Sequence, residues 1–351
     1  MSNRLHNSEK VSYASSFTLQ DIADELGIAK SSVSRALSGS GRISEETRQR
    51  VLACAERHHY KPNLIAKGLA TSRSFNLGVL LPGDSDYSDI PFFHKCLAGI
   101  TQEADEKGYD VLALISRGNS TEHLERVLSQ NKADGIIITR LMENDTRVEL
   151  LEERGLPYTV IGSTHNDGIV QVDTDNGDAC RRFTAKLASS GIRSFLLVGG
   201  PSDITVNQSR LSGFKKAMAD CSINKADWSA AMENQTLHDV EETLDAFFGD
   251  GSAFRPECII AGDDMLCSYV MTYLGRKELS VPDDVKVASF YNSSLLEKYG
   301  SISAIDVNAP LLGKQAALLL LRMLSGEDVE ERNSVEYGML FKDSTAVTTD
   351  R

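Results

Sequence analysis

Two patterns of hydrophobic and polar positions divide this chain near residue 75. Before that point, apolar residues recur three or four positions apart, a spacing that is typical of short helices. Thr18 with Asp21 three positions later has the pattern of a capping box, Gly27 supplies the turn after the first helix, and Ser44 caps the third. Pro62 opens a last short helix. The helices predicted in this way cover residues 18–26, 29–37, about 44–60 and 64–70.

After residue 75, short apolar runs alternate with helical stretches of 10 to 18 residues. Continuous apolar strands that alternate with helices predict parallel sheets covered on both faces. About 270 residues of this pattern exceed a single sheet, so we expect two doubly wound subdomains and an α+α/β fold class for the whole chain. The predicted strands are Leu77–Leu81, Val111–Ile115, Gly135–Thr139, Thr159–Gly162, Phe195–Val198, Cys258–Ala261 and Val285–Phe290.

The charge of the chain is distributed unevenly. The 351 residues carry a formal net charge of −13, which taken as one number argues against nucleic acid as a partner. Residues 1–75, however, hold 11 Lys or Arg and seven Asp or Glu, which gives a net charge of +4. Residues 76–351 hold 26 Lys or Arg and 43 Asp or Glu, which gives a net charge of −17. A small basic part joined to a large acidic part predicts two partners of different chemistry.

Several classes of function find no support in the sequence. The six cysteines show no Cys-x-x-Cys pair and no zinc spacing with histidine, so we expect reduced thiols, no metal site and no cofactor. His58-His59 has no third ligand near it in sequence, which favours a solvated helix end. Neither a phosphate loop, a nucleophile elbow nor a zinc-protease motif is present, so an enzyme is not expected. With no secretory leader and no long apolar run, the chain is expected in the cytoplasm without a membrane partner.

The second predicted helix has the surface chemistry of a DNA-reading helix. Thr18 to Leu37 reads as two short helices joined at Gly27, with Lys30, Ser31, Ser34 and Arg35 left on the outer face of the second. An arginine can bind guanine through two hydrogen bonds, and small hydroxyls suit phosphates or base edges. Taken alone, the same pattern also fits an ordinary surface helix.

Further motifs extend this pattern along the first 70 residues. They are Thr18-Leu19-x-Asp21-Ile22-Ala23, Gly27-Ile28, Ser32-Val33-Ser34-Arg35, Ile43-Ser44-x-x-Thr47-Arg48, Tyr60-x-Pro62-Asn63 and Ala66-x-x-Leu69-Ala70. In this order and spacing they resemble the LacI-type family of bacterial repressors. The resemblance implies a homodimer that binds a palindromic operator in double-stranded DNA, with a hinge helix over 63–70 whose Leu69 enters the minor groove. Without the family resemblance, Leu69 would be interpreted as a core residue. The residues expected to contact DNA are Thr18, Lys30, Ser31, Ser34, Arg35, Arg42, Ser44, Thr47, Asn63, Ala66 and Leu69.

The larger part of the chain continues the resemblance. In this family it is similar to periplasmic sugar-binding proteins, with a ligand cleft between two subdomains joined by three crossovers, here expected near 163–168, 291–308 and 325–334. The motifs are Pro91-Phe92-Phe93, Ala133-Asp134-Gly135-Ile136-Ile137, Val172-Asp173-x-Asp175-Asn176, Arg210-Leu211-Ser212-Gly213-Phe214, Pro256-x-x-Ile259-x-Ala261-x-Asp263-Asp264-Met265 and Leu312-Gly313-x-x-Ala316. The expected domains are a flexible tail over 1–16, a helix-turn-helix domain over 17–61, a hinge and linker over 62–75, and an effector-binding domain over 76–347. The last divides into subdomain one over about 76–163 and 293–325 and subdomain two over about 168–290 and 330–347.

A small carbohydrate is the expected effector of the cleft. Sugars are bound by carboxylates, amides and guanidinium groups, with an aromatic ring against the apolar face. Arg210 could instead pair with a neighbouring acid, Asp263 could cap a helix over 265–274, and Trp228 could pack within a polar loop. Phe92 and the adjacent Phe93 are not both expected to face the cleft. The positions that match ligand residues of the family are Phe92, Arg210, Trp228, Asp263, Tyr291 and Asn292.

One departure from the family pattern bears on the ligand. Many members carry Gly-Phe-Asp-Asp where this chain has Ser289-Phe290-Tyr291-Asn292-Ser293, so a ligand-binding acid is replaced by tyrosine. This Ser-Phe-x-Asn-Ser motif resembles that of the maltose-type regulators and favours a disaccharide over a small monosaccharide as the ligand. The predicted function is a transcriptional repressor of carbohydrate-utilisation genes, controlled by that sugar. A sugar-binding protein without the DNA-binding part and a sugar-processing enzyme are the alternatives.

Overall fold

The computed structural model describes residues 17–38, 41–60, 68, 71–84, 90–164, 166–249, 252 and 254–346. The chain forms two compact units, Met1–Arg73 and Ser74–Arg351. This boundary lies inside the linker predicted over 62–75. The predicted helix over 64–70, with Asn63, Ala66 and Leu69, and the tail over 1–16 lie outside the described residues.

Three helices lie in the described residues of the first unit, around one small core. These are α1 (Leu19–Leu26), α2 (Lys30–Ser38) and α3 (Glu45–Arg57). The capping box of Thr18 and Asp21 is confirmed, Gly27 adopts the left-handed conformation with φ 65°, and the Ser44 side chain accepts from the Thr47 amide. Each of these satisfies a backbone group that the end of a helix leaves unpaired. The buried core residues are Ile22, Ala23, Val33, Ala36, Val51, Cys54 and Ala55.

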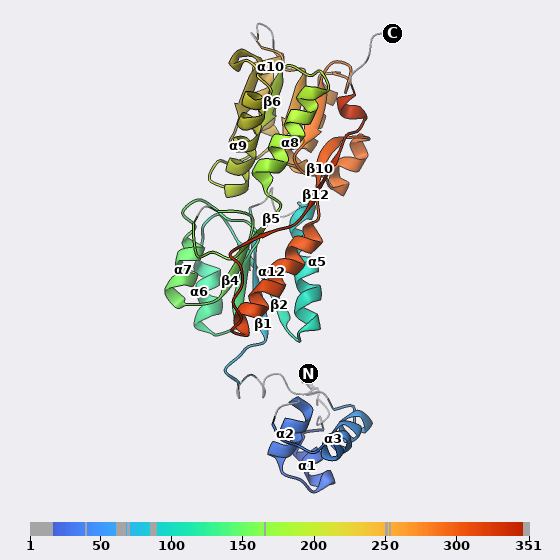
Figure 1. Cartoon of the computed structure of the whole chain (residues 1–351). Helices are drawn as coiled ribbons and strands as arrows, with labels where there is room; N and C mark the ends of the chain where they lie inside the picture. The colour runs from blue at the N-terminus through green and yellow to red at the C-terminus, as the bar shows by residue number, and fades with distance from the viewer. Residues whose placement is uncertain are drawn as a thin grey trace, which may run out of the picture. The chain divides into compact units, whose positions relative to one another are not determined.

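The described residues of the second unit form two six-stranded sheets, each covered by helices on both faces (Figure 1). The first sheet has the strand order β11-β5-β4-β3-β1-β2 and is parallel throughout. Helices α5 (Pro91–Glu106) and α12 (Ala309–Leu324) pack on one face, and α6 (Glu122–Ser129) and α7 (Thr146–Arg154) on the other. Its strands are β1 (Asn76–Pro82), β2 (Asp110–Ser116), β3 (Gly135–Ile138), β4 (Tyr158–Ile161), β5 (Gln171–Asp173) and β11 (Arg332–Ser334).

The second sheet has the order β12-β10-β9-β8-β6-β7, and only β12 runs antiparallel among its described strands. Helices α8 (Asn176–Ser189) and α9 (Thr205–Asp220) pack on one face, and α10 (Leu237–Phe248) and α11 (Asp264–Arg276) on the other. Its strands are β6 (Phe195–Val198), β7 (Trp228–Ala231), β8 (Cys258–Ala261), β9 (Lys286–Ser289), β10 (Ser303–Val307) and β12 (Tyr337–Leu340). Three 3₁₀ turns, Lys225–Asp227, Ser294–Tyr299 and Asp343–Thr345, complete this half.

Among the described elements the chain passes between the sheets three times. Two passages fall at the ends of the ranges predicted over 291–308 and 325–334, whereas the first lies after the range predicted over 163–168. The passages lie between β5 and α8 at 173–176, between β10 and α12 at 307–309, and between β11 and β12 at 334–337. The predicted starts of subdomain two at 168 and 330, and the return to subdomain one at 293, are therefore wrong. Short strands caused these errors: three-residue β5 and β11 join the first sheet, and β10 joins the second.

Candidate functional site

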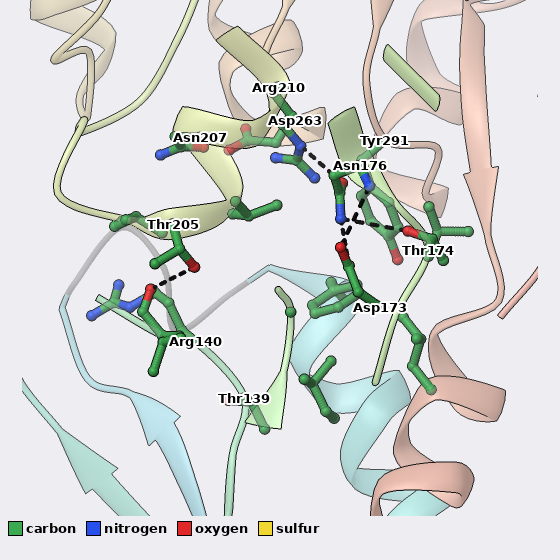
Figure 2. Close-up of a pocket in the computed structure, with 18 of the residues that line it drawn as sticks. Thr139, Arg140, Asp173, Thr174, Asn176, Thr205, Asn207, Arg210, Asp263 and Tyr291 are labelled. Carbon is green, nitrogen blue, oxygen red and sulfur yellow. Dashed lines mark hydrogen bonds between the residues drawn. The ribbon is translucent and has the colours of Figure 1, made fainter. Parts of the chain in front are cut away.

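A cleft lies between the two sheets, where the carboxyl ends of their strands meet (Figure 2). Thr139 follows β3, Gly162 follows β4, and Thr174 follows β5, whereas Asp263 and Tyr291 follow β8 and β9 of the second sheet. The first turns of α5, α9 and α11 add further lining residues. Parallel α/β sheets place ligand sites at this edge, because the loops there diverge and helix amino-terminal ends point inward.

Three carboxylates, contributed by both halves, line the cleft. Asp263 caps α11 as predicted, accepting a hydrogen bond of 2.8 Å from the Leu266 amide. Asp264 accepts a hydrogen bond from the Ser293 hydroxyl, and Asp173 accepts one of 2.6 Å from Asn176 Nδ2. Burial raises the pKa of Asp263 and Asp173, and burial together with the Asp263 charge raises the pKa of Asp264 to about 6. These carboxyl groups lack the solvation that water would supply, so they are ready hydrogen-bond partners for a polar ligand.

Arg210 projects from α9 into the same cleft (Figure 2). Its Nε donates to Asn176 Oδ1 at 3.4 Å, and its positive charge lowers the pKa of Asp263 against the larger effect of burial. It forms no ion pair within 4 Å in the described part of the chain, so the alternative of a structural ion pair is not supported. The guanidinium group thus lines the cleft together with the carboxylates.

Three aromatic rings form an apolar wall of the cleft. Phe92 lies 5.5 Å from Tyr291 and 5.4 Å from Phe93, measured between ring centroids, in edge-to-face arrangements. Both phenylalanines line the cleft, so the expectation that they do not both face it is wrong. Both also pack against the hydrophobic core, because the first turn of α5 lies between that core and the cavity. The Tyr291 hydroxyl is buried and has no hydrogen-bond partner among the described residues. A buried hydroxyl without a partner costs free energy, which a ligand hydroxyl would recover.

Two of the predicted effector residues lie outside this cleft. Trp228 begins β7 and pairs in register with Phe195, the first residue of β6, so it lies at the amino end of the sheet, opposite the cleft. There it packs against Phe214, with centroids 5.7 Å apart, and Lys225 Nζ lies 3.3 Å from the centre of its ring. The expected stacking of Trp228 on the ligand is therefore contradicted by the fold. Asn292 lines a separate polar cavity and donates to Asp306 Oδ1 at 3.1 Å.

Other lining residues were not among the sequence candidates. Asp173 and Asn176 belong to a motif that the sequence displayed, but their role depends on β5, which the pattern did not predict. These residues lie at the end of a strand, just after one, or in the first turn of a helix, which is the signal that could have identified them. They are Thr139, Arg140, Asp173, Thr174, Asn176, Thr205, Asn207 and Asp264.

A short backbone pairing joins the two halves at the edge of the cleft. The Glu143 amide donates to the Asp203 carbonyl at 2.7 Å, and the Thr205 amide donates to the Leu141 carbonyl at 3.2 Å. Residues 140–145 are held by a buried ion pair in which Arg147 Nε lies 2.7 Å from Asp145 Oδ1. Because this loop is fixed in its own half, its backbone is already positioned to pair with residues 203–205. We call this pairing the cross-cleft ladder.

The first unit presents the predicted DNA-reading surface. Lys30, Ser31, Ser34 and Arg35 are all exposed on α2, whereas Val33 faces the core. Among the other expected DNA contacts, Thr18, Arg42 and Ser44 are exposed and Thr47 is half-buried. The hydroxyls of Ser44 and Thr47 lie 2.8 Å apart at the start of α3. The amino end of a helix with small hydroxyls is a suitable site for a phosphate.

Two sequence expectations concern the chain as a whole. All six cysteines are free, five of them buried. In the described part of the chain, no helix combines the length and the apolar character needed to cross a bilayer.

Comparison with known proteins gives consistent matches over both units. The profile described as "Bacterial regulatory proteins, lacI family" matches residues 18–63, and "Periplasmic binding protein-like domain" matches residues 184–345. HTH-type transcriptional regulator MalR of Staphylococcus xylosus is 28% identical over 321 residues, covering 89% of this chain and 93% of MalR. A structure of the transcriptional regulator CelR in complex with cellobiose is 23% identical, with a TM-score of 0.67, covering 93% of this chain and 99% of CelR. A structure of the lac repressor dimer bound to operator is 21% identical, with a TM-score of 0.75, covering 94% of this chain and 99% of the lac repressor chain.

Proposed function

This chain belongs to the lacI family of bacterial regulatory proteins, and on that premise we propose how it couples a sugar to an operator. It is a sequence-specific transcriptional regulator, a repressor whose affinity for DNA is controlled by a small carbohydrate. The observation that carries the proposal is the presence in one chain of the exposed α2 surface and of a cleft lined by carboxylates, amides, a guanidinium group and aromatic rings. Its place of action is the cytoplasm, where the DNA lies.

The operator is bound by a homodimer through α2. Arg35 supplies a fork of donors for a guanine, Lys30 and Ser31 read neighbouring bases, and the hydroxyls of Ser34, Ser44 and Thr47 bind phosphates. Arg42, Thr18 and Asn63 add backbone contacts, and the segment with Ala66 and Leu69 enters the minor groove. The net charge of +4 on residues 1–75 favours this end of the chain for DNA.

Selection of bound sequences from random duplexes tests this part of the proposal. We expect a palindromic consensus, with affinity that falls as salt rises because counterions are released from the DNA. Arg35→Ala should weaken consensus binding by about 5- to 100-fold and relax the preference at one base pair in each half-site. Arg154→Ala, which removes the same charge from the exposed end of α7, is the control and should bind normally. Binding without sequence preference would refute the proposal.

The effector is a disaccharide bound in the cleft. Asp263, Asp264, Asp173 and Arg210 supply paired hydrogen bonds to sugar hydroxyls, and Phe92 with Tyr291 packs against the apolar face of a ring. The cellobiose complex of CelR, which shares the fold, supports a disaccharide. A thermal-shift screen of mono- and disaccharides tests this, because a ligand of the folded state raises the unfolding temperature. A shift with a monosaccharide or a purine, and none with disaccharides, would exclude this ligand class.

Coupling between the two sites follows from linkage. The sugar binds one relative arrangement of the two halves better than another, and the operator favours one arrangement of the dimer. Each ligand therefore changes the affinity of the other by the same factor. Measuring sugar affinity with and without operator duplex determines that factor and its sign, which distinguishes an inducer from a co-repressor. Equal sugar affinities in the two measurements would refute the coupling.

A further inference from the structure

A cluster of metal-ligating side chains lies in the first unit. Glu25 is in the last turn of α1, Cys54 lies in α3, and His58 caps α3 four residues later. Their sulfur, nitrogen and carboxylate oxygen atoms all lie within 4.8 Å of one another. The spacing of four residues puts Cys54 and His58 on one face of the helix, and the packing of α1 brings the carboxylate to that face. His58 lies at the end of α3, as the sequence predicted, and its side chain is half-buried there.

The contact between His58 and Glu25 requires a proton or a metal ion between the two side chains. His58 Nε2 lies 2.7 Å from Glu25 Oε2, yet among the described residues this nitrogen is buried and makes no hydrogen bond of acceptable geometry. An imidazole nitrogen without a proton and a carboxylate oxygen each present a lone pair, so at this distance either a proton on Nε2 or a metal ion must lie between them. A metal ion that takes the place of that proton beside Cys54 Sγ would bind all three groups.

The surroundings orient each of the three ligands. Arg57 Nη1 binds the other oxygen of Glu25 at 2.9 Å, which leaves Oε2 for the cluster. The Phe17 ring stacks on the His58 imidazole, with centroids 4.0 Å apart and planes 12° apart, and so fixes the plane of the histidine. Such supporting contacts are typical of metal sites. The His58 and Glu25 side chains are each 32% exposed, which leaves a path for an ion and room for a water ligand.

We propose that Glu25, Cys54 and His58 bind one zinc ion, with water as the fourth ligand. One sulfur, one nitrogen and one oxygen donor suit the borderline-soft Zn²⁺ better than Mg²⁺ or Ca²⁺, which prefer oxygen ligands alone. Binding forms a zinc–sulfur bond and releases the thiol proton to solvent. In the absence of metal, burial and the neighbouring Glu25 raise the pKa of Cys54, so the thiol keeps its proton until the ion arrives. The ion ties the end of α1 to the end of α3.

Cobalt titration of the metal-free full-length protein tests the site directly. Co²⁺ substitutes for Zn²⁺ and shows a thiolate charge-transfer band and tetrahedral ligand-field bands. We expect one equivalent to bind, the bands to disappear when zinc is added, and Cys54→Ser to abolish the charge-transfer band. Cys221→Ser, at the half-buried cysteine of the other unit, is the matched control and should keep the band. No band, or a band that survives in Cys54→Ser, would overturn the proposal.

A second variant and a second measurement test the site even if Cys54→Ser fails to fold. His58→Asn changes a half-buried residue, and competition with a chelator should show at least roughly tenfold weaker zinc binding while the circular dichroism of the chain is unchanged. Zinc should raise the unfolding temperature of the first unit in the wild-type chain but not in His58→Asn. A zinc response that is equal in both chains would overturn the site.

Discussion

The backbone amide of Glu143 donates a hydrogen bond to the carbonyl of Asp203, and this bond of 2.7 Å joins the two halves of the sensor across its cleft. Together with the pairing of Met142 and Ile204, it makes a short antiparallel bridge between a loop of the first half and the start of α9. The same segments line the cleft through Arg140, Leu141 and Ile204. Closure of the cleft and enclosure of a ligand therefore depend on the same residues.

The first prediction concerns the side chain that reinforces this ladder. Gln208 Nε2 donates to Glu143 Oε2 at 2.9 Å and to the Ser202 carbonyl at 2.7 Å. Gln208→Ala should weaken sugar binding roughly two- to fivefold, because an exposed hydrogen bond that favours the closed form contributes about 0.5–1 kcal/mol. Calorimetric titration measures the change. Gln102→Ala, an exposed glutamine on α5, is the control, and tighter or unchanged binding in Gln208→Ala would show that the ladder does not hold the cleft closed.

The second prediction concerns the hydroxyl of Tyr291. Because this buried group has no partner among the described residues, its removal in Tyr291→Phe should leave the free energy of unfolding unchanged or slightly higher. Sugar binding should fall about 5- to 20-fold, because the ligand loses a hydrogen bond inside the cleft. Trp228→Phe, outside the cleft, should bind the sugar normally. Equal affinity in Tyr291→Phe and the wild type would exclude the hydroxyl from ligand binding.

The third prediction is a pH dependence of stability. Burial raises the pKa of Asp264 to about 6, above the value of about 4 in an unfolded chain. The folded state therefore binds an extra proton between these values, and this residue makes stability fall as the pH rises from about 4 to 6. The Asp264→Asn variant lacks the negative charge, but its side-chain oxygen can still accept a hydrogen bond from the Ser293 hydroxyl. Its stability relative to the wild type should rise over that range by up to about 2 kcal/mol.

Urea unfolding followed by the fluorescence of Trp228 measures this difference. Trp228 is the only tryptophan and packs in the same half as Asp264, so its signal reports on the relevant sheet. Asp105→Asn, at an exposed position of α5, provides the control for loss of one carboxylate. A constant difference between Asp264→Asn and the wild type from pH 4 to 7 would show that Asp264 titrates normally.

The fourth prediction concerns the contact between α5 and α12. A Cβ atom at Gly313 would lie 2.0 Å from the Cys96 carbonyl oxygen, so Gly313→Ala must push the two helices apart. We expect a loss of about 2–3 kcal/mol in the free energy of unfolding. Gly275→Ala, in α11, meets no atom within 4 Å and should stabilise the chain by about 0.5–1 kcal/mol. Chemical denaturation measures the free energy of unfolding of both variants. Equal changes in the two would show that α5 and α12 move apart without loss of stability.

Much of the local structure followed from patterns of a few residues. Strands β6 and β8 have the predicted bounds, and α1 and α3 begin at the predicted caps. The pattern missed β5, β7, β10, β11 and β12. A strand of three residues such as β5 has no periodicity of its own, and Trp228 was assigned to a loop because β7 is recognisable only from its pairing with β6.

The sequence alone determined the helical DNA-reading unit, the alternation of strands and helices, and part of the cleft, including Arg210, Asp263 and Tyr291. These depend on caps, periodicity and motifs, which are properties of neighbouring residues. The tertiary structure decided that Asp173 faces the same cavity as Tyr291, that Trp228 does not, and that Glu25 meets His58. Those relationships join segments far apart in the chain, and they are set by which strand ends and helix faces pack together.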